Sequence, residues 1–310
     1  MNGIIEKKYT KDELLKFYNL PLEELLELSS QYMSDKVEFC SLVNARNGKC
    51  SQNCKYCAQS SHYRTDIESY PLISVDEVIK VAQEAKENRV SRFAIVTSGK
   101  TPDEGRDFQI ELGMIKEINK IDGISSCASL GILTDEQAKQ LAKVGLKRFH
   151  HNINTCRSYY PEICTTHSWE ERFNTCKLVK KYGMELCCGV ILGMGESIEQ
   201  RVEMAMELAE IEPNSIPINI LMPIPRTPFE NYHDKIDEEN VMRTMAVFKI
   251  ANPKAVIRFC GGRMRLSQEN QELALQTCVE GILVGNYLTT VGKEPSEDIK
   301  TVEKLGKNLV

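Results

Sequence analysis

The sequence predicts an α/β fold, a (βα)8 TIM-type barrel with an N-terminal helical extension. Short apolar segments alternate with amphipathic helical segments, and eight such units fit within about 250 residues, as this barrel requires. A doubly wound parallel sheet is the alternative. It would usually carry a glycine-rich phosphate loop after its first strand, whereas here that strand leads into a group of cysteines.

The elements follow in order along the chain. Residues 1–36 are expected to form a helical cap over the bottom of the barrel, with helices over Lys11–Tyr18 and Leu22–Met33, and residues 37–310 to form the barrel. The expected strands are Phe39–Ala45, Arg92–Thr97, Ser125–Leu130, Arg148–Asn154, Glu185–Leu192, Ser215–Leu221, Ala255–Gly261 and Gly281–Val284. A serine or threonine followed three residues later by Glu or Gln marks helix starts at Ser74, Thr134 and Ser168.

Composition limits the class of protein. The chain has 310 residues, a net charge of −5 and twelve cysteines, with 42% apolar and 27% charged residues. A basic footprint for nucleic acid is missing, and no apolar run approaches the roughly 18 residues of a membrane span. The charged N-terminal segment lacks a signal-peptide core, so we expect a cytoplasmic protein. In a reducing cytosol, twelve cysteines indicate packing residues or metal ligands instead of disulfides.

Three of the cysteines have ligand spacing. Cys50, Cys54 and Cys57 form a C-x3-C-x2-C triplet after the first strand, at the catalytic face of a barrel. A structural zinc site would need a fourth ligand, for which His62 is a candidate. Three thiolates also suit a four-iron cluster with one open iron, which can chelate an amine and a carboxylate together. The aromatic ring of Tyr56, directly before Cys57, can stack on an adenine.

The triplet resembles the CxxxCxΦC signature of the radical S-adenosylmethionine superfamily, in which Φ is aromatic. A second stretch, from Gly189 to Glu196, is similar to the G-x-I-x-G-x-x-E segment with which that superfamily contacts adenine. Within the superfamily, the chain resembles biotin synthases over Cys50 to Thr290. The segments that carry this resemblance are CKYCAQSSHYRT, His151–Thr155, Ile163–His167 with Glu171 and Arg172, Ile216–Asn219, Arg258–Arg263 and Leu288–Thr290.

The resemblance implies an enzyme, EC 2.8.1.6, that inserts sulfur between C6 and C9 of dethiobiotin. A reduced [4Fe-4S] cluster would cleave S-adenosylmethionine to a 5′-deoxyadenosyl radical, which removes the hydrogen atoms. An auxiliary iron–sulfur cluster would donate the sulfur. The family also implies a homodimer and an electron donor such as flavodoxin or ferredoxin. The protein residues orient the cofactors and supply no acid or base.

The resemblance also implies roles for individual residues. Cys50, Cys54 and Cys57 would hold the [4Fe-4S] cluster. Contacts to S-adenosylmethionine would come from Tyr56, Asn152, Asn154, Arg172 and Ile191, with Arg172 pairing with the methionyl carboxylate. Substrate contacts would come from Asn152, Asn219, Thr289 and Thr290.

The auxiliary cluster is where the sequence departs from the family. The family pattern uses three cysteines, on strands two, three and five, and an arginine on strand seven. Cys127, Cys187 and Arg258 match it, but Ala94 stands at the strand-two cysteine. Cys260 shares a strand face with Arg258, since side chains alternate, whereas Cys188 should point outward.

We therefore expect Cys127, Cys187 and Cys260 to hold the auxiliary cluster beside Arg258, with Cys188 as the alternative ligand. The cluster would be [2Fe-2S] or a four-iron variant. The other cysteines lack ligand spacing and are predicted to be packing residues: Cys40, Cys156, Cys164, Cys176 and Cys278.

Two other functions compete with this one. The first is a radical S-adenosylmethionine maturase or mutase that acts on another small molecule and does not need the deep ligands. The second is a zinc-stabilised binding protein without catalysis. The features that favour biotin synthase over both are Asn219, the Thr289–Thr290 pair and the deep set Cys127, Cys187 and Arg258.

Overall fold

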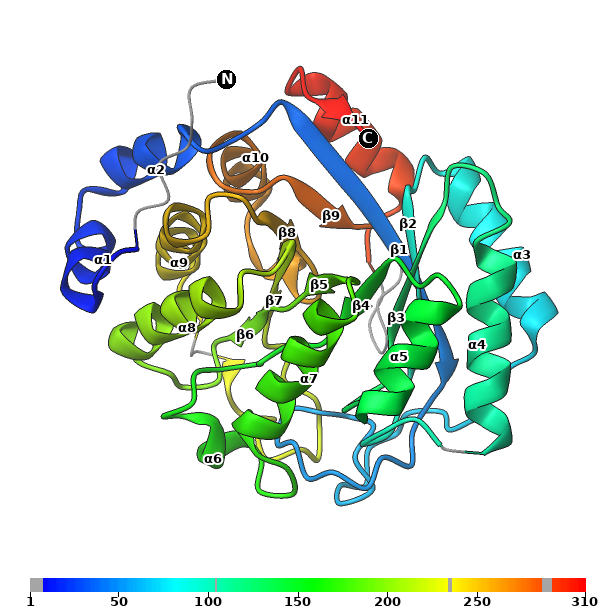
Figure 1. The fold of residues 1–310 in the computed structure, drawn as a ribbon. Coiled ribbons are helices and arrows are strands. Elements are labelled where there is room, and N and C mark those ends of the chain that lie inside the picture. Colours follow the sequence, from blue (N-terminus) through cyan, green and yellow to red (C-terminus); the bar gives the residue numbers. More distant parts are fainter. Residues whose placement is uncertain (1–7, 104, 234–235, 286–291) are drawn as a thin grey trace.

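The chain forms a closed parallel β-barrel surrounded by helices, which confirms the predicted fold (Figure 1). The computed structural model describes residues 8–103, 105–233, 236–285 and 292–310. The strands are β1 (Lys36–Arg46), β2 (Arg92–Thr97), β3 (Ser125–Ser129), β4 (Arg148–His150), β5 (Glu185–Cys187), β6 (Val190–Leu192), β7 (Ser215–Ile220), β8 (Val256–Phe259), β9 (Gly281–Leu283) and β10 (Asn308–Leu309). The barrel closes because β1 pairs in parallel with both β2 and β9. β10 adds a short pairing at the start of β1.

The helices lie around the barrel, and α1, α2, α3, α5 and α7 begin where the sequence indicated. They are α1 (Lys11–Tyr18), α2 (Leu22–Ser30), α3 (Val75–Glu87), α4 (Arg106–Ile118), α5 (Asp135–Lys143), α6 (Tyr160–Ile163), α7 (Trp169–Lys181), α8 (Ile198–Ile211), α9 (Glu238–Ala251), α10 (Gln268–Thr277) and α11 (Pro295–Lys304), with a 3-10 turn at Arg263–Arg265. Complete capping boxes start α3, α5 and α7 at the predicted residues Ser74, Thr134 and Ser168. Among the described residues, no helix is both long and apolar enough to span a bilayer.

The predicted strand Glu185–Leu192 is divided into β5 and β6 at Cys188 and Gly189. A β-carbon on Gly189 would lie 1.9 Å from the carbonyl oxygen of Pro217 in β7, so only glycine allows the two backbones to approach this closely. The strand expected over Arg148–Asn154 also ends early, at His150. Asn154 has a φ of 67°, in the left-handed region that asparagine tolerates better than most residues.

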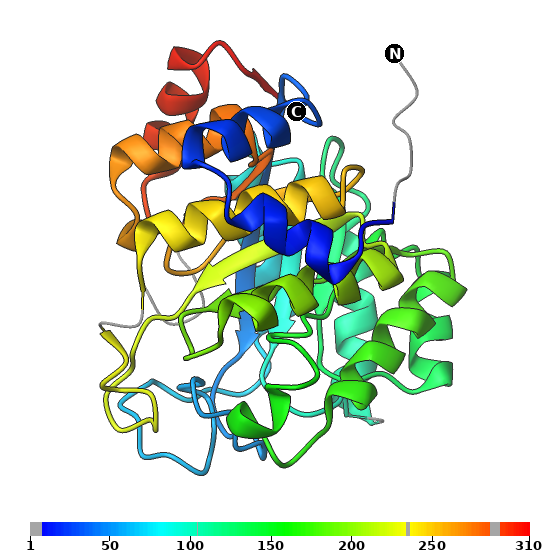
Figure 2. The ribbon, with the colours of Figure 1, turned by 90° about the vertical axis from the view of Figure 1, so that its left-hand side faces the viewer.

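The two N-terminal helices lie along the outside of the helical layer and not across the bottom of the barrel. In Figures 1 and 2 they run beside α8, α9 and α10. Buried apolar residues, including Leu14 on α1 and Leu25 on α2, face these outer helices, and the Tyr18 hydroxyl donates to Asn240 at the start of α9. The apolar stripe of each helix is therefore buried against α8, α9 and α10 in a third layer.

The long loops gather at one end of the barrel, where the strands have their carboxyl ends. Figure 2 shows the loop after β1, the segment around α6 and the loop after β7 together at this end, opposite the C-terminus. Parallel strands bring all their carboxyl ends to one edge, so residues distant in sequence meet here.

Gly189→Ala should destabilise the fold by about 1–3 kcal/mol or more, because the new methyl group overlaps a backbone oxygen that cannot rotate away. Gly113→Ala in α4 is the matched control. Nothing lies within 4 Å of its added β-carbon, so it should instead stabilise the helix by about 0.5–1 kcal/mol. Urea unfolding followed by circular dichroism measures both. Equal effects of the two substitutions would contradict the close approach of β5 and β7.

Candidate active site

The cysteine triplet lies on a loop that is fastened to the segment after α6. The backbone N–H of Lys55 donates to the carbonyl of Ile163 at 2.9 Å, and the Asn53 amide donates to the Thr165 hydroxyl at 2.7 Å. The Asn53 side-chain oxygen in turn accepts from the backbone N–H of Thr165 at 3.0 Å. Residues 163–167, which carried part of the family resemblance, therefore hold the loop in position.

Residues 56–59 of this loop line a cavity of about 320 Å³ at the carboxyl ends of the strands. Tyr56 and Cys57 form one side of the cavity, and side chains from several strands form the rest. Burial raises the pKa of the Cys57 thiol to about 11. Five further residues predicted for the site also line the cavity: Asn152, Arg172, Ile191, Asn219 and Cys260.

Arg172 provides the cavity with a positive charge that has no acidic partner among the described residues. Its Nε donates to the backbone carbonyl of Asn152, and one Nη lies 3.4 Å from Nε2 of His167. Its positive charge is desolvated, and the Tyr160 and Tyr56 hydroxyls and the Cys54 thiol raise its pKa above the ordinary value. A half-buried guanidinium without a carboxylate partner is suited to bind an anionic group of a ligand.

The asparagines around the cavity keep part of their hydrogen-bonding capacity. Asn219 donates to the carbonyl of Val190 and accepts from the N–H of Gly261, both at 3.1 Å. An amide can donate twice and accept twice, so one N–H and one lone pair of Asn219 remain for a ligand. The buried Nδ2 of Asn154 has no partner among the described residues. Thr289 and Thr290 lie outside the described residues.

A buried charge network closes the lumen below the cavity. The Glu38 carboxylate of β1 pairs with Arg258 of β8, with Arg148 of β4 at 2.8 Å and with Arg92 of β2 at 2.7 Å. Burial raises the pKa of Glu38, but the three guanidinium groups outweigh burial and hold that pKa well below its usual range. Gly281 of β9 lies between β1 and β8, and its missing side chain leaves the space through which Arg258 reaches Glu38.

The predicted auxiliary thiols lie in the lumen above this network. Cys127 and Cys187 are fully buried. The pKa of each thiol is lowered by Arg148 and raised by Cys40. Burial raises their pKa values to about 12 and about 11. Cys260 lies higher, where it also borders the cavity. Sequence reasoning missed the fourth thiol of this lumen, Cys40, which packs against Cys260.

Two predicted auxiliary-cluster residues are engaged elsewhere. The thiol of Cys188 lies 3.7 Å from that of Cys176 on α7, so it points outward from the barrel. All three nitrogens of Arg258 donate hydrogen bonds, to Ser215 and to Glu38. Burial opposes the charge of Arg258, but nearby Cys40 and Glu38 raise its pKa above the ordinary value.

Sequence reasoning also missed contacts of the triplet. The thiol of Cys164, predicted to be a packing residue, lies 3.7 Å from that of Cys54 and 3.2 Å from Nδ1 of His167. In the described part of the chain, these three residues alone form a group of His, Cys, Asp or Glu ligand atoms within 4.8 Å of one another. His62, the candidate fourth ligand of the alternative zinc site, contacts the Ser51 carbonyl at 3.1 Å. A contact across 110 residues has no signal in local spacing.

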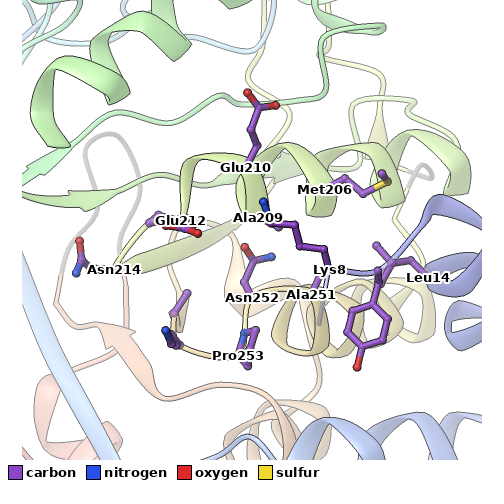
Figure 3. A pocket seen from close by; sticks show the side chains of 14 residues that line it. Lys8, Leu14, Met206, Ala209, Glu210, Glu212, Asn214, Ala251, Asn252 and Pro253 are labelled. Atoms are coloured by element: carbon purple, nitrogen blue, oxygen red, sulfur yellow. The ribbon is translucent and has the colours of Figure 1, made fainter. Parts of the chain in front are cut away.

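A second cavity, of about 470 Å³, lies at the opposite end of the barrel (Figure 3). Its lining comes from the ends of α8 and α9 and from α1, and includes Met206, Glu210 and Asn252. None of the residues predicted for the active site lines it. The cavity bordered by the cysteine loop is therefore the candidate active site.

Two protein-family models match successive parts of the chain. Residues 46–209 match the radical SAM superfamily, and residues 217–308 match the biotin and thiamin synthesis associated domain. A biotin synthase of Acetivibrio thermocellus is 46% identical over 91% of this chain and 88% of its own length. A biotin synthase of Clostridium tetani is 40% identical over 98% and 97% of the two chains.

Solved structures show the same fold at low sequence identity. A methylornithine synthase superposes with a TM-score of 0.83 at 16% identity, covering 98% of this chain and 95% of its own. HydG, a maturase of the [FeFe]-hydrogenase, gives a TM-score of 0.83 at 17% identity, covering 98% and 72%. These two likenesses concern the fold alone.

Glu38→Gln should lower the free energy of unfolding by about 3–5 kcal/mol near neutral pH, because it removes the carboxylate shared by three guanidinium groups, of which Arg148 and Arg258 are buried. Glu303→Gln, which removes an exposed ion pair with Arg89, should cost at most about 1 kcal/mol. Urea unfolding of both variants and the unsubstituted protein checks the difference. A Glu38→Gln cost as small as that of the control would contradict the network.

The same network predicts an acid dependence. The pKa of Glu38 is lower in the folded state than in the unfolded state, so its contribution is complete above the unfolded value of about 4.3. The contribution is lost as the pH falls below that value toward the folded pKa. The stability advantage of the unsubstituted protein over Glu38→Gln should therefore shrink between about pH 5 and about pH 3. An advantage that grows on acidification would contradict the assigned direction.

Proposed function

The chain belongs to the biotin synthase family, and on this premise we propose that it converts dethiobiotin to biotin by inserting sulfur between C6 and C9. The observation that carries this function is the match to curated biotin synthases at up to 46% identity over nearly the whole chain. The cavity supports it, since a cysteine loop, an unpaired arginine and an amide-bearing strand border one space.

Cys50, Cys54 and Cys57 would hold the [4Fe-4S] cluster that membership in the radical SAM superfamily implies. Support comes from Cys57, which borders the cavity, and from the hydrogen bonds that fasten the loop to residues 163–167. When bound, this cluster supplies the electron that cleaves S-adenosylmethionine, and the auxiliary cluster supplies the sulfur. The chain's residues position the reactants and exclude water around them.

Arg172 would bind the carboxylate of S-adenosylmethionine through a charge-assisted hydrogen bond. It supplies this cavity with a half-buried positive charge, and no acidic side chain among the described residues competes for it. Tyr56 would stack on the adenine and Ile191 would contact its other side, since both border the cavity. Asn152 and Asn154 would bind the ribose hydroxyls, for which the unpartnered Nδ2 of Asn154 is a suitable donor.

Asn219 would bind the ureido ring of dethiobiotin, with Asn152 as its second contact. A urea offers both donors and an acceptor, and the free N–H and lone pair of Asn219 complement them. The backbone bonds of Asn219 to Val190 and Gly261 hold the amide in one orientation. Thr289 and Thr290, which would bind the substrate carboxylate, stay a prediction from the family resemblance.

Cys127, Cys187 and Cys260 would hold the auxiliary cluster, of the [2Fe-2S] type or a four-iron variant. Their burial in the lumen below the cavity supports this role, because a sulfur donor must lie beneath the substrate and away from water. Arg258 would contribute positive charge and, through its ion pair with Glu38, would hold together the charge network below the cavity. Cys188 is not included, since it faces Cys176 outside the lumen. A flavodoxin or ferredoxin donor, a homodimer and a cytoplasmic location stay predictions from the family.

Anaerobic incubation with S-adenosylmethionine, a low-potential reductant and dethiobiotin tests the function directly. Biotin and 5′-deoxyadenosine should both form, as measured by chromatography with mass detection. Formation of 5′-deoxyadenosine without biotin would retain the radical class and contradict the substrate, leaving a maturase or mutase as the alternative. A colourless protein that binds one zinc ion and forms neither product would contradict the radical class as well.

Arg172→Gln should weaken S-adenosylmethionine binding by about 10–100-fold, because a charge-assisted hydrogen bond contributes about 1.5–3 kcal/mol. Arg157→Gln is the matched control, since Arg157 is exposed beside the same helix and pairs with Glu170. Equilibrium dialysis against labelled S-adenosylmethionine, with the first cluster present, measures both variants. Equal affinity of the Arg172 and Arg157 variants would contradict the carboxylate contact.

A further inference from the structure

The alternation of β1 points Cys40 into the lumen. Glu38, two residues earlier, reaches Arg258, Arg148 and Arg92 from the opposite and adjacent strands, which is possible only from inside the barrel. Residues two apart on a strand share a face, so Cys40 faces inward directly above Glu38. It is 3% exposed and packs with Cys260 and Leu283 in a small cluster separate from the main core.

Cys40 lies within electrostatic reach of all three thiols predicted to hold the auxiliary cluster. Its electrostatic interaction raises the pKa of each of the three thiols, Cys127, Cys187 and Cys260. Burial raises the pKa of Cys40 itself, against the lowering effect of Arg258. These four cysteines come from β1, β3, β5 and the end of β8, so they surround the lumen instead of occupying one side of it.

The other candidates for the missing ligand do not present a free ligand atom in the lumen. Ala94 of β2, which stands at the family's cysteine, carries no ligand atom. Cys188 faces α7, and the nitrogens of Arg258 are committed to Glu38 and Ser215. Cys40 is on β1, the strand next to β2, and Ala94 itself pairs with Leu42 of β1 on one side and Cys127 on the other.

We propose that Cys40 is a ligand of the auxiliary iron–sulfur cluster, in place of the cysteine that Ala94 has replaced. The proposal rests on the proposed function, since it requires an auxiliary cluster in the lumen. It converts the ligand set from three thiols and an arginine to the four thiols Cys40, Cys127, Cys187 and Cys260.

The spacing and charge of the lumen favour a cluster with several irons. The ligand atoms of a single ion lie close together, and the four lumen thiols are not among the groups within 4.8 Å in the described residues. Thiolate ligands also add negative charge, which a dry lumen tolerates only beside cations. Below the thiols, three guanidinium groups face two carboxylates, Glu38 and Glu185, and leave one positive charge uncompensated.

The test isolates the auxiliary cluster in a full-length chain in which Cys50, Cys54 and Cys57 are all replaced by alanine. Cys40→Ala and Cys40→Ser are added to this background, with Cys278→Ala as the control, a fully buried thiol at the end of α10. After anaerobic reconstitution with ⁵⁷Fe and sulfide, iron and sulfide per chain are measured and Mössbauer spectra are recorded. Circular dichroism and urea unfolding monitor folding.

Cys40→Ala should lose auxiliary iron and sulfide relative to the background chain, whereas Cys278→Ala should retain both. Cys40→Ser should either lose the cluster or keep iron with an altered Mössbauer doublet, because an alkoxide oxygen replaces a sulfur. Retention of the background iron content and spectrum by both folded Cys40 variants would overturn the proposal while leaving the proposed function intact. A background chain that binds no second cluster would overturn this proposal together with the proposed sulfur source.

Discussion

The shared carboxylate of Glu38 is the interaction on which the arrangement of the lumen depends. Three guanidinium groups converge on it from β2, β4 and β8, and it is the carboxylate that all three share. The three ion pairs tie β1 to strands on several sides of the barrel, and they fix which residues of each strand face inward. The thiols of the lumen and the polar groups of the cavity stand in layers above this floor, so their positions follow from it.

The charge network, the lumen thiols and the cavity form three layers, and each layer has different surroundings. At the floor, ion pairs satisfy buried charges and close the lumen from below. The thiols above them are buried, and the cavity with Arg172 and Asn219 is bordered by the cysteine loop. Each layer is built from residues two apart on the same strands, as in Glu38 and Cys40 or Arg258 and Cys260. In a parallel barrel, the inward-facing residues of each strand therefore lie at successive depths along the barrel axis.

Much of this architecture could be predicted because its signals are local. Alternating apolar segments marked the strands, capping boxes marked the starts of α3, α5 and α7, and the triplet spacing marked the cluster loop. The division of one strand at Gly189 could not be predicted, because it depends on a contact with Pro217 in another strand. The outer position of α1 and α2 likewise depends on grooves formed by helices more than 170 residues away. Thr289 and Thr290 remain predictions, since they lie outside the described residues.

Cys40 shows a different limit of sequence reasoning, because the same alternation that assigned Cys260 to the lumen applies to β1. What the sequence did not provide was the orientation of that strand. Only the ion pairs of Glu38 show which of its faces is inward. Once that face is known, Cys40 becomes the candidate ligand, and Arg258 becomes a source of positive charge. An arginine whose three nitrogens all donate to neighbours acts as a fixed charge, whereas the thiol beside it still has a free lone pair. The loss of a thiol at Ala94 therefore does not imply a weaker ligand set, because the neighbouring strand carries a thiol to the same chamber.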